Sequence, residues 1–280
     1  GLSALLWKAK ANHNIKGIMT SQQGVCISHL LFADDNLLFC RATVEECQNL
    51  LTLLEKYEAA SGQAINRQKT SLFFSKNTRQ DVRNTIQQML GERVMHDCER
   101  YLGLPMICGR SKVNMFKEIQ EKISKRVMGW KEKFISKAGR EILIKTVTQV
   151  IPTYSMSFLG YLNLSVIAST PSWQNIGGDR TMEEEDPWIN WIKLCIHKYN
   201  GGMGFQDLYA FNLAMVAKQA WRLIHNTHSL FHRVYKARYF PRSSFLKAEL
   251  GPNPSFVWRS LLEARDIIME GSRWQVGDGR

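Results

Sequence analysis

His29-Leu30-Leu31-Phe32-Ala33-Asp34-Asp35-Asn36-Leu37-Leu38-Phe39-Cys40 places two apolar runs on either side of two adjacent carboxylates. The runs 25–31 and 37–40 are rich in strand-forming residues, and Asp34-Asp35-Asn36 supplies turn residues between them. This pattern predicts a β-hairpin with the acids at its tip. Two carboxylates on a short turn offer the oxygen ligands that Mg²⁺ prefers, although the same pair is also common in a plain solvated turn.

The centre of this stretch is the first of several motifs that occur in a fixed order along the chain. They are Phe32-Ala33-Asp34-Asp35, residues 62–75 (GQAINRQKTSLFFS), Tyr101-Leu102-Gly103-Leu104-Pro105, Gly129-Trp130-Lys131, Gly201-Gly202-Met203-Gly204-Phe205 and Ala210-Phe211-Asn212-Leu213-Ala214. In this order and spacing they resemble the reverse transcriptase of plant LINE-type (non-LTR) retrotransposons, together with the segment after its thumb. The likeness covers most of the chain, except residues 160–186.

The resemblance implies RNA-directed DNA polymerisation, with an RNA template and a DNA primer as partners. Such a polymerase uses Mg²⁺ ions to clamp the attacking and leaving oxygens of the phosphoryl transfer. Asp34 and Asp35 match the catalytic, metal-binding carboxylates of the family, and Lys69 matches a general acid that assists the departure of pyrophosphate. Lys69 can equally be read as a surface lysine at the start of a strand.

The resemblance also implies nucleic-acid contacts beyond the hairpin. Leu102 and Gly103 fall in a primer grip, although Gly and Pro punctuate any strand and turn. From residue 110 to 145 there are eleven Lys or Arg against four Glu, an excess of seven. Basic helices with an apolar stripe suit a polymerase thumb that lies along a duplex backbone, while the alternative is a solubilising face. The expected contacts are Lys112, Lys117, Lys122, Lys125, Arg126, Lys131 and Lys133.

The sequence before Asp34 contains no Asp or Glu, whereas the resemblance implies a further metal-binding carboxylate upstream of the hairpin. We therefore expect an N-terminally truncated fragment with a weak Mg²⁺ site, because Mg²⁺ dehydrates reluctantly and needs its charged ligands. As a result, we expect no polymerisation by this chain alone. The alternatives are a non-catalytic basic protein that binds RNA or DNA and a decayed retroelement product.

The composition limits the partners. The 280 residues carry a formal net charge of +12 and a pI near 9.5, which favours nucleic acid as a partner ahead of an anionic membrane surface. No apolar run approaches the roughly 18 residues of a membrane span, and no signal peptide is visible. The six cysteines lack zinc-finger spacing. We expect an intracellular protein of the nucleus or cytoplasm with reduced thiols.

Periodicity and turn residues predict an α+β fold. Helices are expected over residues 1–10, 44–61, 78–90, 138–151, 208–225 and 256–270, and a strand over 71–75 beside the hairpin. The resemblance implies a partial polymerase palm at 1–108 and a helical thumb at 109–159, and we expect a poorly defined linker at 160–187. A mostly helical post-thumb region at 188–280 would precede a zinc-binding-type segment of the family.

Residues 208–248 contain no acid but seven Lys or Arg, interleaved with aromatic side chains. These aromatics are Trp221, Phe231, Tyr235, Tyr239, Phe240 and Phe245. Aromatic rings beside cations are typical of proteins that bind single-stranded nucleic acid, although rings at helical spacing more often belong to a core. The glycine run that precedes this segment, residues 201–204, lacks the Gly-Lys-Ser/Thr ending of a phosphate loop and predicts a turn.

Overall fold

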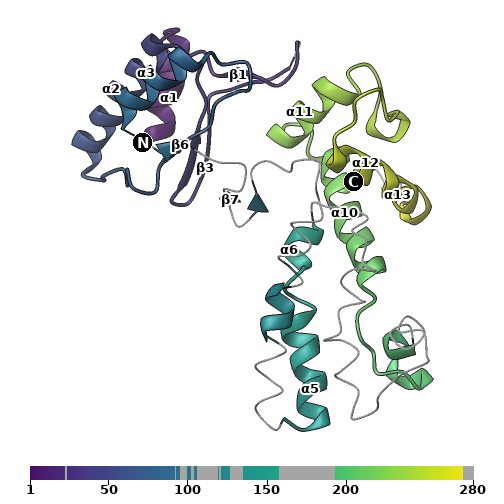
Figure 1. The fold of residues 1–280 in the computed structure, drawn as a ribbon. Coiled ribbons are helices and arrows are strands. Elements are labelled where there is room, and N and C mark those ends of the chain that lie inside the picture. Colours follow the sequence, from purple (N-terminus) through teal and green to yellow (C-terminus); the bar gives the residue numbers. More distant parts are fainter. Residues whose placement is uncertain are drawn as a thin grey trace, which may run out of the picture. The chain divides into compact units, whose positions relative to one another are not determined.

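The computed structural model describes residues 1–22, 24–91, 93–94, 100–101, 104–105, 119, 121–126, 135–157 and 193–273 (Figure 1). It divides into two compact units, Gly1–Gly109 and Arg110–Arg280. Helices and two-stranded sheets make the α+β class expected from the sequence. The unit boundary lies beside the end of the predicted palm. The four-part division stays a prediction, and the predicted linker lies outside the described residues.

The described part of the first unit contains three helices: α1 (Leu2–Ala11), α2 (Val44–Ser61) and α3 (Gln80–Leu90). The predicted helices agree with them to within two residues. Thr43 caps α2, since its hydroxyl accepts the N–H of Glu46, and Gly62 ends α2 in the left-handed conformation at φ 70°. Leu6 and Ala9 of α1 pack with Leu53 of α2, so these two helices share one core.

Two antiparallel pairs precede α2. β1 (Ile18–Met19) pairs with β2 (Cys26–Ile27), and β3 (His29–Phe32) pairs with β4 (Asp35–Leu38). The predicted hairpin is therefore present. The run 25–31, which we expected to be one strand, is divided at Ser28, because β2 pairs with β1 while β3 pairs with β4. Gly17 permits the approach of β1 to β2: a Cβ there would lie 2.5 Å from the Ile27 carbonyl oxygen.

The strand that follows α2 differs from the prediction. β5 (Ser71–Leu72) has two residues and pairs in parallel with β6 (Arg93–Val94), so a strand over 71–75 beside the hairpin was wrong. The helix α3 lies between these strands and supplies the crossover that a parallel pair requires. β7 (Arg100–Tyr101) then pairs antiparallel with β8 (Leu104–Pro105).

In the second unit, residues 121–126 are helical, and α5 (Lys137–Leu143) leads into a π-helical stretch, η1 (Ile144–Thr148). The N–H of Gln149 donates to the carbonyl of Ile144 at 3.0 Å, five residues back. The predicted helix 138–151 thus changes its hydrogen-bond pattern midway. This arrangement leaves Ile144, Thr148 and Gln149 all buried. The short helix α6 (Thr153–Met156) comes next.

The other described elements of the second unit are helices. They include η2 (Lys198–Asn200), α10 (Leu208–His225), α11 (Leu230–Tyr239), η3 (Phe245–Lys247), α12 (Phe256–Glu263) and α13 (Arg265–Gly271). The helix expected over 208–225 is confirmed. The single helix expected over 256–270 was wrong, because α12 ends at Glu263 and α13 begins at Arg265, with the buried Ala264 between them.

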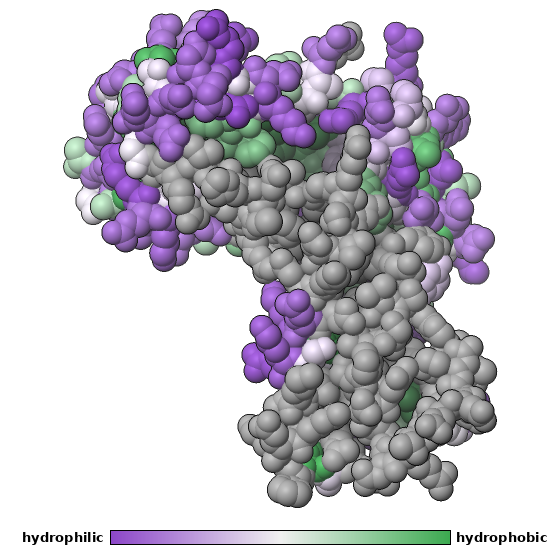
Figure 2. All heavy atoms as spheres, viewed as in Figure 1, coloured by the Kyte–Doolittle hydropathy of each residue, from purple (hydrophilic) through white to green (hydrophobic). Residues whose placement is uncertain are grey.

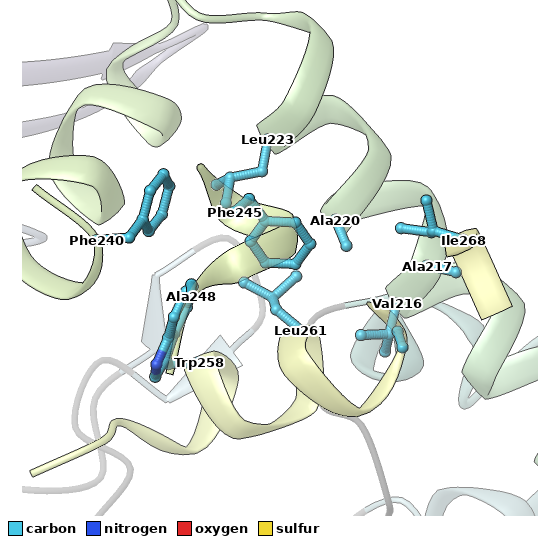
Figure 3. Packing of buried hydrophobic residues seen from close by; sticks show 11 residues of the cluster. Val216, Ala217, Ala220, Leu223, Phe240, Phe245, Ala248, Trp258, Leu261 and Ile268 are labelled. Carbon is cyan, nitrogen blue, oxygen red and sulfur yellow. The ribbon is translucent and has the colours of Figure 1, made fainter. Parts of the chain in front are cut away.

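The core of this unit forms around Trp258 (Figure 3). Its indole is fully buried, stacks on Tyr239 at 4.6 Å between ring centroids and on Phe240 at 5.7 Å, and donates Nε1–H to the Leu250 carbonyl. Leu223 and Val216 of α10 point into the same cluster. Most rings of the acid-free segment are therefore core residues. Burial raises the pKa of the neighbouring Tyr235 to about 12.

Candidate functional site

The turn of the β3–β4 hairpin carries both predicted carboxylates. Phe32 pairs with Asp35, so Ala33 and Asp34 are the two residues of the turn and Asp35 begins β4. Ala33 has a positive φ of 49°, at the turn position where glycine is common in two-residue hairpins. The backbone thus holds the carboxylates next to each other at the hairpin tip, as the sequence predicted.

Asp34 and Asp35 are both exposed, and their carboxylates accept no hydrogen bond and form no ion pair within the described part of the chain. The two side chains supply four carboxylate oxygens, which is the type of ligand that Mg²⁺ binds. They are fewer than the octahedral coordination of Mg²⁺ requires. The described residues contain no group of three or more His, Cys, Asp or Glu able to hold a metal ion.

Strand alternation separates the two faces of the hairpin. Leu38 of β4 packs against the core shared by α1 and α2. Asp35 lies three residues before Leu38, and an odd separation along a strand places two side chains on opposite faces. The side chain of Asp35 therefore points away from this core, as does that of its cross-strand partner Phe32. The phenyl ring of Phe32 is 61% exposed. The carboxylate face is therefore the face of the hairpin that the first unit's core leaves open.

The base of the hairpin is fixed to α1 through His29. The Oγ of Ser3 lies 2.9 Å from His29 Nε2, and the Oγ of Ser28 lies 3.0 Å from Nδ1. The indole of Trp7 meets the imidazole edge-on at 6.1 Å between centroids. Burial, and then the positive charge of Lys10, lower the pKa of His29. The neutral imidazole is thus favoured where it holds the hairpin.

A second attachment comes from Glu46 of α2, which the sequence did not identify. Its Oε2 accepts the backbone N–H of Lys16 at 3.2 Å and that of Arg41 at 3.0 Å. Lys16 precedes β1, and Arg41 follows β4. Glu46 is only 7% exposed, whereas the adjacent Glu45 is exposed. One buried carboxylate therefore joins α2 to both ends of the strand region.

Lys69 is exposed in the turn before β5, where its backbone N–H donates to Asn66. Within the described residues, no hydrogen bond or ion pair links its amine to the hairpin carboxylates. The predicted role of Lys69 as a general acid thus stays a prediction. Leu102 and Gly103, the predicted primer grip, fall between β7 and β8 and lie outside the described residues.

Three of the predicted thumb cations can be placed. Lys122, Lys125 and Arg126 are exposed on the helical residues 121–126, while Ile123 between them is fully buried. None of the three forms an ion pair with a described residue. The other predicted contacts, Lys112, Lys117, Lys131 and Lys133, lie outside the described residues.

The surface of the described residues is mostly hydrophilic on the face drawn in Figure 2, with small apolar patches. None of the helices described is both long and apolar enough to cross a membrane. The seven Lys and Arg of residues 208–248 form no salt bridge within the described part of the chain, and the segment itself contains no acid.

The described residues define an α+β protein with a carboxylate-bearing hairpin in one unit and a basic, mostly helical second unit. The chain belongs to the same family as a protein of Arabidopsis thaliana named "Uncharacterized mitochondrial protein AtMg00310". The two are 36% identical over 135 residues, which cover 46% of this chain and 85% of that protein. No family model matches the sequence.

A second relative is a longer protein of Arabidopsis thaliana, named "Putative ribonuclease H protein At1g65750". It is 32% identical over 185 residues, which cover 63% of this chain and 29% of that protein. This chain therefore spans less than a third of the length of the second relative. Both relatives are plant proteins, as the resemblance of the motifs implied.

Proposed function

We propose that this chain is a retroelement-derived plant protein that descends from a reverse transcriptase and binds nucleic acid. The observation that carries the proposal is the hairpin, whose tip presents two adjacent exposed carboxylates, Asp34 in the turn and Asp35 at the start of β4. One relative is named "Putative ribonuclease H protein At1g65750". The net charge of +12 favours a polyanionic partner.

In this proposal Asp34 and Asp35 are two ligands of a Mg²⁺ site, and Mg²⁺ would supply Lewis-acid activation of phosphate oxygens when bound. Residues 1–33 contain no further carboxylate. Polymerisation therefore requires a carboxylate from another source, and the activity of this chain alone is binding of a template–primer without extension. This favours the non-catalytic binding function over the catalytic one for the isolated chain.

The exposed cations on residues 121–126 are proposed to contact phosphates of the template–primer. Such contacts release counterions, so the logarithm of the binding constant falls with the logarithm of the salt concentration, by about 0.9 per phosphate on a duplex. The test is filter binding of a poly(A)–oligo(dT) template–primer between 50 and 300 mM salt. A flat salt response would overturn the proposal.

A charge variant and a matched control sharpen this experiment. Replacement of Lys122, Lys125 and Arg126 by Gln removes three phosphate contacts, so the salt slope should become shallower by about 2.7. The control replaces Lys8, Lys56 and Lys76 by Gln. These are three exposed lysines of the first unit with no assigned role. Equal slopes for the two triple variants would show that only the net charge matters, which contradicts the proposed contact surface.

A further inference from the structure

The helix α10 has one buried and one exposed face. Val216, Ala217, Ala220 and Leu223 point into the core beside α12 (Figure 3). Successive helix positions are about 100° apart, so positions 218, 221, 222 and 225 fall on the opposite side within an arc of about 100°. We name Lys218, Trp221, Arg222 and His225 the α10 surface. All four residues are exposed.

Trp221 and Tyr209 are the two exposed rings of the acid-free segment, and Trp221 is the one on the α10 surface. Its side chain is 44% exposed, whereas Phe240 and Phe245 in the same segment are 2% and 3% exposed. Leaving so large an apolar ring in water gives up the free energy that burial of its surface would supply. The core does not explain this position.

Trp221 is held by a second ring on the same surface. The imidazole of His225 lies 4.0 Å from the indole centroid at an interplanar angle of 33°, and His225 Nδ1 lies 3.3 Å from the Trp221 carbonyl oxygen. Because a carbonyl oxygen only accepts, Nδ1 carries the proton of this contact. The two rings therefore form an ordered pair in which His225 supports one side of the indole.

The cations beside this pair form no ion pair with the residues that the structure describes. Residues 208–248 contain no Asp or Glu, and neither Lys218 nor Arg222 forms a salt bridge with a described residue. Arg222 donates one N–H to Gln219 at 3.1 Å, which leaves further guanidinium donors. By contrast, Lys145 and Lys198 elsewhere in the unit both pair with Glu141. The α10 surface thus combines an ordered exposed ring with unpaired positive charge.

We propose that the α10 surface binds single-stranded nucleic acid. An unpaired base stacks on Trp221, and Lys218 and Arg222 neutralise the phosphates beside it. A duplex keeps its base faces hidden in the stack, so the indole can engage only an unpaired base, and stacking of this kind tolerates any sequence. The inference rests on the proposed nucleic-acid binding and deepens it by adding a site on α10 that distinguishes single strands from duplexes.

The test measures fluorescence anisotropy of a labelled twelve-residue oligo(dT) and of a labelled twelve-base-pair duplex with the full chain. Stacking on one ring contributes enough that Trp221→Ala should weaken oligo(dT) binding at least about fivefold, while duplex binding changes less than about twofold. Trp221→Phe keeps a ring and should remain within about twofold of the unmodified chain on both probes.

Tyr199→Ala is the matched control for an exposed ring. Tyr199 is 94% exposed and stacks on His197 at 5.1 Å, but it lies outside the acid-free segment. This variant should leave oligo(dT) binding unchanged. An equal loss in Tyr199→Ala, or an equal loss of Trp221→Ala on both probes, would overturn the inference, and so would an unchanged Trp221→Ala.

A charge variant gives a second test of the inference and leaves every apolar side chain in place. Replacement of Lys218 and Arg222 by Gln should make the salt slope for oligo(dT) shallower by about 1.4, at about 0.7 per phosphate on a single strand. The control replaces Lys56 and Lys76 by Gln. If Trp221→Ala does not fold, the salt slopes of these two double variants test the inference instead. Equal slopes for the two variants would overturn it. If the unmodified chain binds neither probe, the proposed function itself fails.

Discussion

The β3–β4 hairpin and the α10–α13 core place their chemistry in opposite ways. At the hairpin tip, the carboxylates of Asp34 and Asp35 are exposed and form no hydrogen bond or ion pair with a described residue, while Glu46 and His29 hold the hairpin from its base. In the core, Trp258 is enclosed by rings on several sides. The hairpin carboxylates are thus positioned by residues at the base of the hairpin, whereas Trp258 is positioned by the rings that it contacts.

The same contrast recurs within one residue type. Trp258 and Trp221 both belong to helices of the second unit, yet one is 0% and the other 44% exposed. Trp258 is packed in the core, whereas Trp221 is exposed. Substitution of Trp258 should therefore lower the stability of the second unit, and substitution of Trp221 should lower the binding of single-stranded nucleic acid. The following predictions test this division, from the largest expected effect to the smallest.

Trp258→Ala should destabilise the second unit by about 3–5 kcal/mol, because it removes a buried aromatic side chain and leaves a cavity among Tyr239, Phe240 and Phe245. Urea denaturation followed by far-ultraviolet circular dichroism measures the change. The matched variant Trp221→Ala should cost less than about 1 kcal/mol. Similar losses in the two variants would contradict the division between core and surface rings.

Glu46→Ala should cost about 2–3 kcal/mol, because the backbone N–H groups of Lys16 and Arg41 lose their charged acceptor in a buried site. Glu46→Gln keeps an oxygen acceptor and should cost less. The neighbouring Glu45→Ala, at an exposed position of the same turn, should cost no more than about 0.5 kcal/mol. Thermal or urea unfolding of the three variants decides, and equal costs at positions 45 and 46 would refute the assigned role of Glu46.

Ala33→Gly should stabilise the hairpin by about 0.5–1 kcal/mol, since glycine adopts the positive φ of 49° without the steric cost that alanine meets. Ala59→Gly in α2 provides the opposite control, because glycine inside an exposed helix costs about 1 kcal/mol. Urea midpoints of both variants give the measurement. A destabilising Ala33→Gly would show that the turn does not strain Ala33.

The pH dependence should be the smallest effect. The pKa of His29 is lowered in the folded chain by burial, so the unfolded chain binds more protons as the pH falls below about 6.5. This contribution to stability is therefore present above pH 6.5 and is lost as the pH falls through the folded-state pKa. Urea midpoints at pH 7.5 and 5.5 should differ less in His29→Gln than in the unmodified chain. The same reduction in His228→Gln, at an exposed position, would argue against His29.

The sequence predicted those features that depend on neighbouring residues. Alternating apolar runs around Asp34-Asp35 gave the hairpin, and apolar spacing with a terminal Gly62 gave α2. The pairing of β5 with β6 could not be read in this way, because it joins residues separated by α3. The end of α12 at Glu263 also lacks a local signal, since neither glycine nor proline follows it.

The site residues show the same limit. Helical spacing places Glu46, four residues before Leu50 and seven before Leu53, nearer the buried side of α2 than Glu45, but it does not show that the carboxylate accepts the N–H groups of Lys16 and Arg41. In residues 208–248, cations and rings alternate throughout, and only the packing of α10 against α12 shows that Trp221 stays outside while Phe240 and Phe245 go in. Burial depends on which face another helix covers, which the local pattern does not encode.

The central claim is that this chain binds a template–primer without extending it. The most direct measurement is primer extension on a poly(A)–oligo(dT) template–primer with Mg²⁺ and thymidine triphosphate, comparing the unmodified chain with Asp34→Asn. The account predicts that both proteins bind the template–primer and that neither extends it. Extension by the unmodified chain that is lost in Asp34→Asn would contradict it, because a complete catalytic site would then exist within these 280 residues.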